Sequence, residues 1–181
     1  MDQQKYVYIL VSQSGTGVSR MLRRVTRDPY NHVSLALDAN LQRMYSYGRR
    51  RLRNPFIGGF VRETPQTGVF GHFPEADAVV VKLPMGGAEY EKLQARMQEM
   101  YRHRKEYRYD FLGVALAYFG KAKRRNHKSY CSKFVADELQ TAGVTMPQKT
   151  VFRPVDFLAL PEGKTVFSGK LRAYKPKLAE K

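Results

Sequence analysis

The stretch SYCSKFVADEL, residues 129–139, contains no proline or glycine, and its third residue, Cys131, is the only cysteine of the chain. Its apolar positions recur every three or four residues, which is the spacing of one helical face. These positions are Cys131, Phe134, Val135, Leu139 and, just beyond, Ala142. The pattern predicts a helix with Ser129 as its N-cap and Gly143 as its stop.

The place of Cys131 in the first turn of this helix favours chemistry at its sulfur. Unpaired backbone N–H groups and the positive end of the helix dipole both stabilise a thiolate, which is the form that attacks carbon. A nucleophilic thiol needs a general base, and the base needs a third group that orients its ring. We expect His32 to be the base and to meet Cys131 in space, although the two are far apart in sequence.

His32 opens a predicted β-hairpin. Residues 32–38 alternate as a strand does, residues 38–41 form the expected turn, and residues 43–48 form the return strand. His32 is then expected near the end of the hairpin that lies opposite the turn.

The return strand should supply the third catalytic group. A two-residue turn would place Tyr47 opposite His32, and a slip of one residue would place Ser46 there. We take Ser46 as the candidate, and the alternatives are Tyr45, Tyr47 and the more distant Glu63.

The rest of the chain alternates less regularly but still divides into elements. We expect strands at 6–12 and 77–83, short edge strands at 60–63 and 69–73, a loop from the arginines after residue 48 to Asn54-Pro55, and a last strand at 165–171. We expect helices at 18–25, 88–107 and 110–119, and a turn or helix start at 153–157. Strands that are segregated from helices indicate the α+β class.

The composition bounds the class of protein. With 181 residues, 43% of them hydrophobic and 12% aromatic, the chain suits one folded domain over 1–181, with a basic C-terminal tail from about residue 172. A single cysteine excludes an intramolecular disulfide. No secretory signal or membrane span is recognisable, so a cytoplasmic protein is expected.

The charge is strongly basic, with 32 Lys and Arg against 16 Asp and Glu, a formal net charge of +16 and a pI near 10.1. Such a surface attracts anionic lipid, cell-wall polymer or nucleic acid. The basic residues form four blocks: Arg49, Arg50, Arg51 and Arg53; Arg102, Arg104, Lys105 and Arg108; Lys121, Lys123, Arg124, Arg125 and Lys128; and Lys164, Lys170, Arg172, Lys175, Lys177 and Lys181.

The four histidines and one cysteine do not have the spacing of a metal site, and the glycines match no phosphate-binding fingerprint. No cofactor or metal is therefore expected.

Four segments together carry a family resemblance. They are YNHVSLALD at 30–38, MYSYGR at 44–49, NPFIGGF at 54–60 and YCSKFV at 130–135. The set resembles the circularly permuted branch of the NlpC/P60 papain-like superfamily, in particular the YiiX/YycO group of permuted amidases, in which the histidine precedes the cysteine.

The resemblance implies a papain-like α+β fold with an antiparallel barrel-like sheet packed against helices. It implies that Cys131 is the nucleophile and His32 the base, with a polar third group near residues 45–47. It also implies a cysteine hydrolase (amidase or peptidase) or acyltransferase that acts on a peptide, amide or lipid ester.

A second interpretation from a different class is a basic module that binds nucleic acid or an anionic surface on an inherited papain-like fold and has no catalytic activity. In the segment 101–109 aromatic and basic residues alternate, as they do where bases stack on rings. The more ordinary explanation is a helix end whose aromatic residues face the core.

Overall fold

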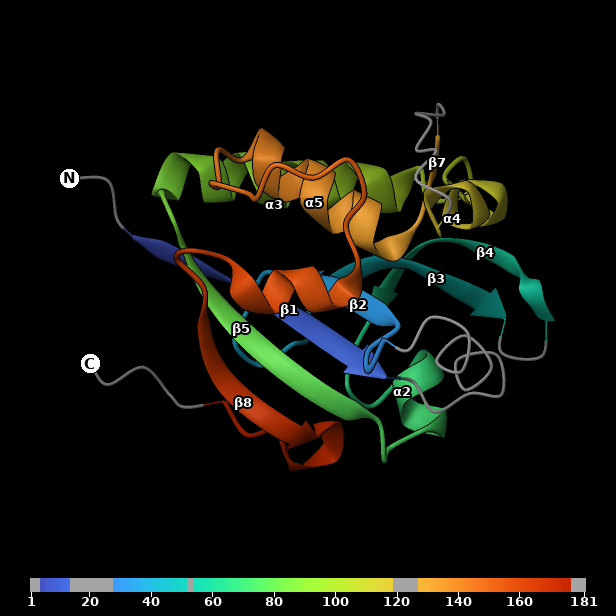
Figure 1. Cartoon of the computed structure of the whole chain (residues 1–181), viewed down its shortest axis with the longest axis horizontal. Coiled ribbons are helices and arrows are strands. Elements are labelled where there is room, and N and C mark those ends of the chain that lie inside the picture. Colours follow the sequence, from blue (N-terminus) through green and yellow to red (C-terminus); the bar gives the residue numbers. More distant parts are fainter. Residues whose placement is uncertain (1–3, 14–27, 52–53, 119–126, 177–181) are drawn as a thin grey trace.

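A computed structural model describes residues 4–13, 28–51, 54–118 and 127–176 of the chain (Figure 1). Its strands are β1 (Lys5–Gln13), β2 (His32–Ala36), β3 (Met44–Arg51), β4 (Asn54–Glu63), β5 (Asp77–Met85), β6 (Arg108–Tyr109), β7 (Lys128–Ser129) and β8 (Lys164–Lys170). Its helices are α2 (Gly68–His72), α3 (Gly87–Arg102), α4 (Phe111–Tyr118) and α5 (Cys131–Thr141), with short 3₁₀ helices η1 (Pro154–Ala159) and η2 (Leu171–Ala173).

All the described strands join one eight-stranded sheet in the order β7-β6-β4-β3-β2-β1-β5-β8. The pairing is antiparallel except between the two shortest strands, β6 and β7, which run parallel. Strands β1 to β4 form a meander, the chain then crosses through α2 to β5 on the other side of β1, and the larger helices come later in the chain. The architecture is therefore α+β, as the sequence predicts.

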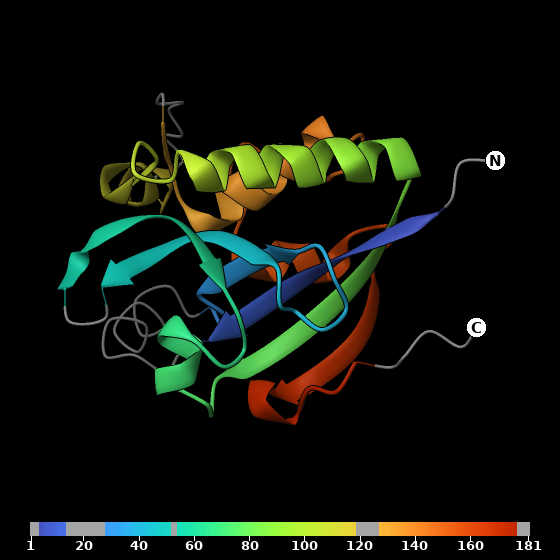
Figure 2. The ribbon, with the colours of Figure 1, turned by 180° about the vertical axis from the view of Figure 1, so that it is seen from behind.

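Each face of the sheet carries its own hydrophobic cluster, because side chains alternate along every strand. Val7, Ile9 and Val11 of β1 point to the face that α3, α5 and η1 cover. Leu10 of the same strand points to the opposite face, where Phe70 of α2 and Leu171 of η2 lie. Figures 1 and 2 show α3 and α5 on one side of the sheet and α2 on the other.

Most predicted elements are confirmed. The strands at 6–12, 77–83 and 165–171 correspond to β1, β5 and β8, and the hairpin corresponds to β2 and β3. The long helix ends at Arg102 rather than at residue 107, and α4 starts after Asp110, whose carboxylate caps it by accepting a hydrogen bond from the Gly113 N–H at 2.8 Å.

Two predictions about the segment after the hairpin are wrong. The loop expected from residue 49 to Pro55 is taken up largely by strands, because β3 continues to Arg51 and β4 begins at Asn54. The edge strand expected at 69–73 is helix α2, whose Phe73 N–H bonds to the Val69 carbonyl at 3.0 Å. Phe70 drives this outcome, since the turn buries its ring against the second cluster.

The observed hairpin register differs from both predicted ones, by one residue from the register with Tyr47 opposite His32 and by two from the register with Ser46 there. Ala36 pairs with Met44 and Leu35 with Tyr45, which places Gly48 opposite His32 when the register is continued. The connection is longer than two residues because buried Leu41, at φ 57°, inserts into the core. Asp38 holds the wide turn together by accepting hydrogen bonds from backbone N–H groups at 2.8 and 2.9 Å.

Several predictions fall on residues outside the described part of the chain. These are the helix at 18–25, Arg53 of the first basic block, residues 121–125 of the third block, and Lys177 and Lys181 of the tail. Among the described helices, none has both the length and the apolar character that crossing a bilayer requires.

Candidate active site

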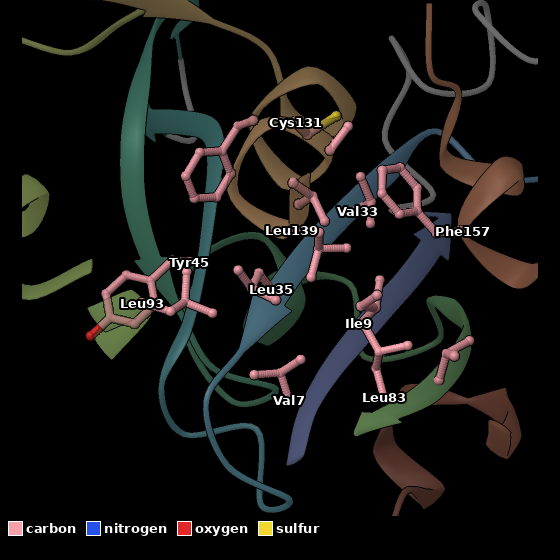
Figure 3. Packing of buried hydrophobic residues seen from close by; sticks show 14 of the residues in the cluster. Val7, Ile9, Val33, Leu35, Tyr45, Leu83, Leu93, Cys131, Leu139 and Phe157 are labelled. Carbon is pink, nitrogen blue, oxygen red and sulfur yellow. The ribbon is translucent and has the colours of Figure 1, made fainter. Parts of the chain in front are cut away.

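Cys131 is the first residue of α5, as the sequence predicts, and its side chain is buried, with the residue 6% exposed. The helix packs on β2 and β3, and Figure 3 shows the sulfur at the start of α5, beside Val33 of β2. Residue Tyr130 is the N-cap, and no side chain caps the helix. The predicted cap, Ser129, instead pairs in β7 and accepts a hydrogen bond from the Asp110 N–H.

The Cys131 thiol lies close enough to His32 to help raise the pKa of its imidazole. The structure therefore brings together the two residues that the sequence predicts as nucleophile and base. Nε2 of the ring lies 3.0 Å from Oε2 of Glu63, with the His32 and Glu63 side chains only 15% and 9% exposed. Phe70 of α2 flanks the ring at 6.1 Å between centroids.

Ser34 completes the hydrogen-bonded network around the carboxylate. Its hydroxyl donates to Oε2 of Glu63 at 2.7 Å and lies 3.3 Å from Nε2 of His32. Ser34 is two residues beyond His32 on β2, so both side chains point to the same face of the sheet. The fully buried hydroxyl thus fixes the carboxylate against the ring.

Opposing effects set the protonation of this pair. Burial alone would lower the pKa of His32, but the Glu63 carboxylate and the hydrogen bonds to Cys131 and Glu63 outweigh it and raise the pKa to about 10. Burial would raise the pKa of Glu63, but His32 and the Ser34 hydroxyl hold it below its ordinary value. At neutral pH the geometry favours an imidazolium paired with a carboxylate.

The three hairpin candidates for the third group make other contacts. The Ser46 hydroxyl is fully buried and donates to the Val33 carbonyl at 2.8 Å. Tyr45 and Tyr47 point to the opposite face, where their rings pack on Phe60 at 5.8 Å. Burial raises the pKa of both tyrosines. The group that orients the imidazole is Glu63, the most distant of the alternatives.

Gly48 explains how a carboxylate on β4 reaches a ring on β2 across the intervening strand β3. A Cβ at Gly48 would lie 3.4 Å from Oε1 of Glu63 and 3.7 Å from Cε1 of His32. A larger side chain there would separate the two groups. The sequence signal that could have found Glu63 is this glycine opposite His32, with an acidic residue at the end of the following strand.

The described residues contain no group of three or more histidine, cysteine or acidic side chains placed to hold a metal ion. A histidine beside a thiol can in general serve as its base. Comparison of the chain with protein-family models, with curated proteins and with solved structures gives no match.

Proposed function

We propose that the protein is a cysteine-dependent hydrolase or acyltransferase that forms a thioester on Cys131. The observation that carries this proposal is the connected network of Cys131, His32 and Glu63, with the thiol at the N-terminus of a helix. Nucleophile, base and orienting group are the three parts that such catalysis requires. The proposal assigns to Glu63 the orienting role that the sequence suggested for Ser46.

The protons can be followed through the reaction. In the form of the site that attacks, His32 holds the proton that the thiol has given up, and the Glu63 carboxylate stabilises the charge on the ring. The Cys131 thiolate attacks the carbonyl carbon, the bond from carbon to the leaving nitrogen or oxygen breaks, and His32 gives its proton to that leaving group. Neutral His32 then takes a proton from water or from an acceptor alcohol or amine, which attacks the thioester. The carbon–sulfur bond breaks, and the thiolate is regenerated beside protonated His32.

The N-terminus of α5 supports the charged intermediate. The Cys131 backbone N–H lies in the first turn and has no intrahelical partner, and no side chain caps this helix. A donor in this position can bind the oxygen of a tetrahedral intermediate, and one such donor contributes about 3 kcal/mol in other acyl-transfer enzymes.

The substrate is proposed by class. The resemblance to circularly permuted NlpC/P60 proteins, with histidine before cysteine, is consistent with the α+β architecture and with a helix that begins at the thiol. It supports a papain-like arrangement and an amide or ester carbonyl in a peptide or lipid as the target.

Alkylation of Cys131 tests the proposal directly. With iodoacetamide at pH 6.5, the thiol of the wild-type protein should react at least about tenfold faster than free cysteine, because so few free thiols are ionised there. His32→Ala should remove this advantage, whereas His103→Ala, an exposed histidine paired with Glu99, should retain it. A wild-type rate at or below that of free cysteine, unchanged by His32→Ala, would contradict the proposal.

The basic surface favours one alternative, a binding module for nucleic acid or another anionic surface. The exposed residues Arg102, Arg104 and Lys105 lie together at the end of α3. Binding of a short RNA, measured over a salt series, separates the two functions. Binding that falls steeply with salt and is unaffected by Cys131→Ser, in a protein with ordinary thiol reactivity, would favour the module.

A further inference from the structure

A pocket of about 340 Å³ lies beside the candidate active site and is lined in part by Glu63. Strands β3 and β4, the start of α2 and the end of α3 line it. Figure 2 shows the end of α3 above the β3–β4 ribbon and α2 below it. The volume is in the range of small-molecule sites.

The lining is strongly cationic. It includes Arg49, Arg50, Arg62 and Arg104, and Glu63 is its one acidic residue. Oε2 of Glu63 is already engaged by His32 and Ser34.

Three of these guanidinium groups are hydrogen-bonded to neutral acceptors. Arg50 donates to the carbonyl oxygens of Arg104 and Tyr107, and Arg62 donates to the carbonyl of Gln42 at 3.2 Å. Arg104 donates to the carbonyl of Tyr101 at 3.2 Å and lies over the Tyr101 ring. None of these three arginines, Arg50, Arg62 and Arg104, forms an ion pair with a carboxylate in the described part of the chain.

The positive charges also repel one another. The pKa of Arg50 is lowered, first by burial and then by the nearby Arg104 and Arg108. An anion in the pocket would relieve this repulsion. Several arginines that line one cavity suit a polyvalent oxyanion, since each guanidinium group can bind two oxygens of a phosphate.

We propose that this pocket is a binding site for a phosphate group. The site shares Glu63 with the Cys131–His32 network, so a ligand there lies within the electrostatic field of the catalytic pair. Phosphate binding itself does not require Cys131 to be nucleophilic, and it goes beyond the proposed acyl chemistry.

The test is isothermal titration of the full-length protein with inorganic pyrophosphate. Arg62→Gln and Arg104→Gln change exposed side chains and should each weaken binding about tenfold, the effect of losing one charge-assisted hydrogen bond. Arg102→Gln is the matched control, because this exposed arginine is also at the end of α3 but pairs with Glu99 and does not line the pocket.

A second titration identifies the source of the phosphate. Phosphatidylcholine vesicles that contain phosphatidic acid are sedimented with the same variants. Pyrophosphate binding with the expected pattern indicates a soluble phosphate compound, and vesicle binding alone with that pattern indicates a lipid headgroup. Both results support the site.

Two results would overturn it: no binding of either probe, or equal weakening in Arg62→Gln, Arg104→Gln and Arg102→Gln. Cys131→Ser should bind as the wild type does. Loss of pyrophosphate binding in the arginine variants, together with ordinary thiol reactivity, would retain this site and reject the proposed catalysis.

Discussion

At the scale of single residues, the site depends on one buried charge pair. The imidazole of His32 lies near the thiol and is paired with the Glu63 carboxylate, and Ser34 holds that carboxylate in place. Glu63 has no direct role in attacking a substrate in this scheme. It acts through His32, by keeping the ring oriented and protonated.

Replacing Glu63 by glutamine should therefore slow alkylation of Cys131 at pH 6.5 by several-fold, because the His32 pKa falls when the carboxylate is lost. The variant should also lose about 3 kcal/mol of unfolding free energy, the usual cost of breaking a buried pair. Thiol alkylation and chemical denaturation measure the two effects. Glu75→Gln, which removes an exposed carboxylate paired with Arg172, should change neither, and equal effects in both variants would count against the pair.

The pair should also give stability a defined pH dependence. The His32 pKa is raised to about 10. The contribution of His32 to the free energy of unfolding is therefore fully present below about pH 6.5, the pKa of histidine in the unfolded chain, and is lost as the pH rises toward 10. The Glu63 pKa is lowered, so its contribution is present above about pH 4.3 and is lost as the pH falls further.

Chemical denaturation from pH 4 to pH 10 gives the free energy of unfolding of the wild type and of the double variant His32→Gln/Glu63→Gln. The difference between the two free energies measures the contribution of the pair. The difference should be largest between about pH 4.5 and 6.5 and should shrink on both sides. A difference that grows from pH 7 to pH 10 would mean that His32 is not stabilised in its charged form.

Gly48 provides a steric test of the same network. Gly48→Ala should be tolerated, because its Cβ would meet Glu63 and His32 at ordinary contact distances of 3.4 and 3.7 Å. Gly48→Leu should force the carboxylate from the ring and slow Cys131 alkylation about as much as Glu63→Gln does. Far-ultraviolet circular dichroism checks that both variants fold, and equal alkylation rates for the alanine and leucine variants would contradict this role.

At the scale of elements, helix α5 carries the proposed nucleophile and is held in place from two sides. Phe134, Val135 and Leu139 pack on the sheet. On its other side, buried Glu138 accepts a hydrogen bond from Arg96 of α3 at 2.6 Å. Burial raises the pKa of Glu138 despite this partner. Helix α5 therefore depends on Arg96 to stay folded while the Glu138 carboxylate is buried and charged.

Arg96→Met should leave the Glu138 carboxylate buried without its partner and cost about 3 kcal/mol at pH 7.5. The Glu138 pKa would rise further, so the cost should vanish as the pH falls toward 4 and the carboxyl becomes neutral in both the folded and unfolded states. Urea denaturation at pH 7.5 and 4.5 measures this trend. Adding Glu138→Gln should recover part of the loss, and a cost independent of pH would refute the explanation.

At the scale of the whole molecule, the helices and strands that could be predicted are those in which apolar residues follow a clear pattern along the sequence. The long helix, the buried strand at 77–83 and the helix at Cys131 follow from apolar spacing alone. Residues 69–73 are rich in valine and phenylalanine, as strands are, and nevertheless lie in or next to helix α2, where Phe70 is buried. β6 and β7 have two residues each, too few to leave any period.

The candidate site was predictable only in part, for a related reason. Cys131 and His32 stand out by residue type and by their places at the ends of elements. Glu63 depends on the pairing of three strands and on a side chain that is missing at Gly48. Register is set by the wide turn around buried Leu41, and that turn has no short-range signature that a two-residue hairpin rule would detect.

The outermost strand has a consequence for how the protein behaves at high concentration. β8 ends the sheet order, and its pairing with β5 shifts at Val80 and Val81. Lysines stand at both of its ends. Charge and an irregular ladder are the features by which natural proteins prevent another chain from adding to an open edge. This border should therefore resist fibril-like growth even where crowding is severe.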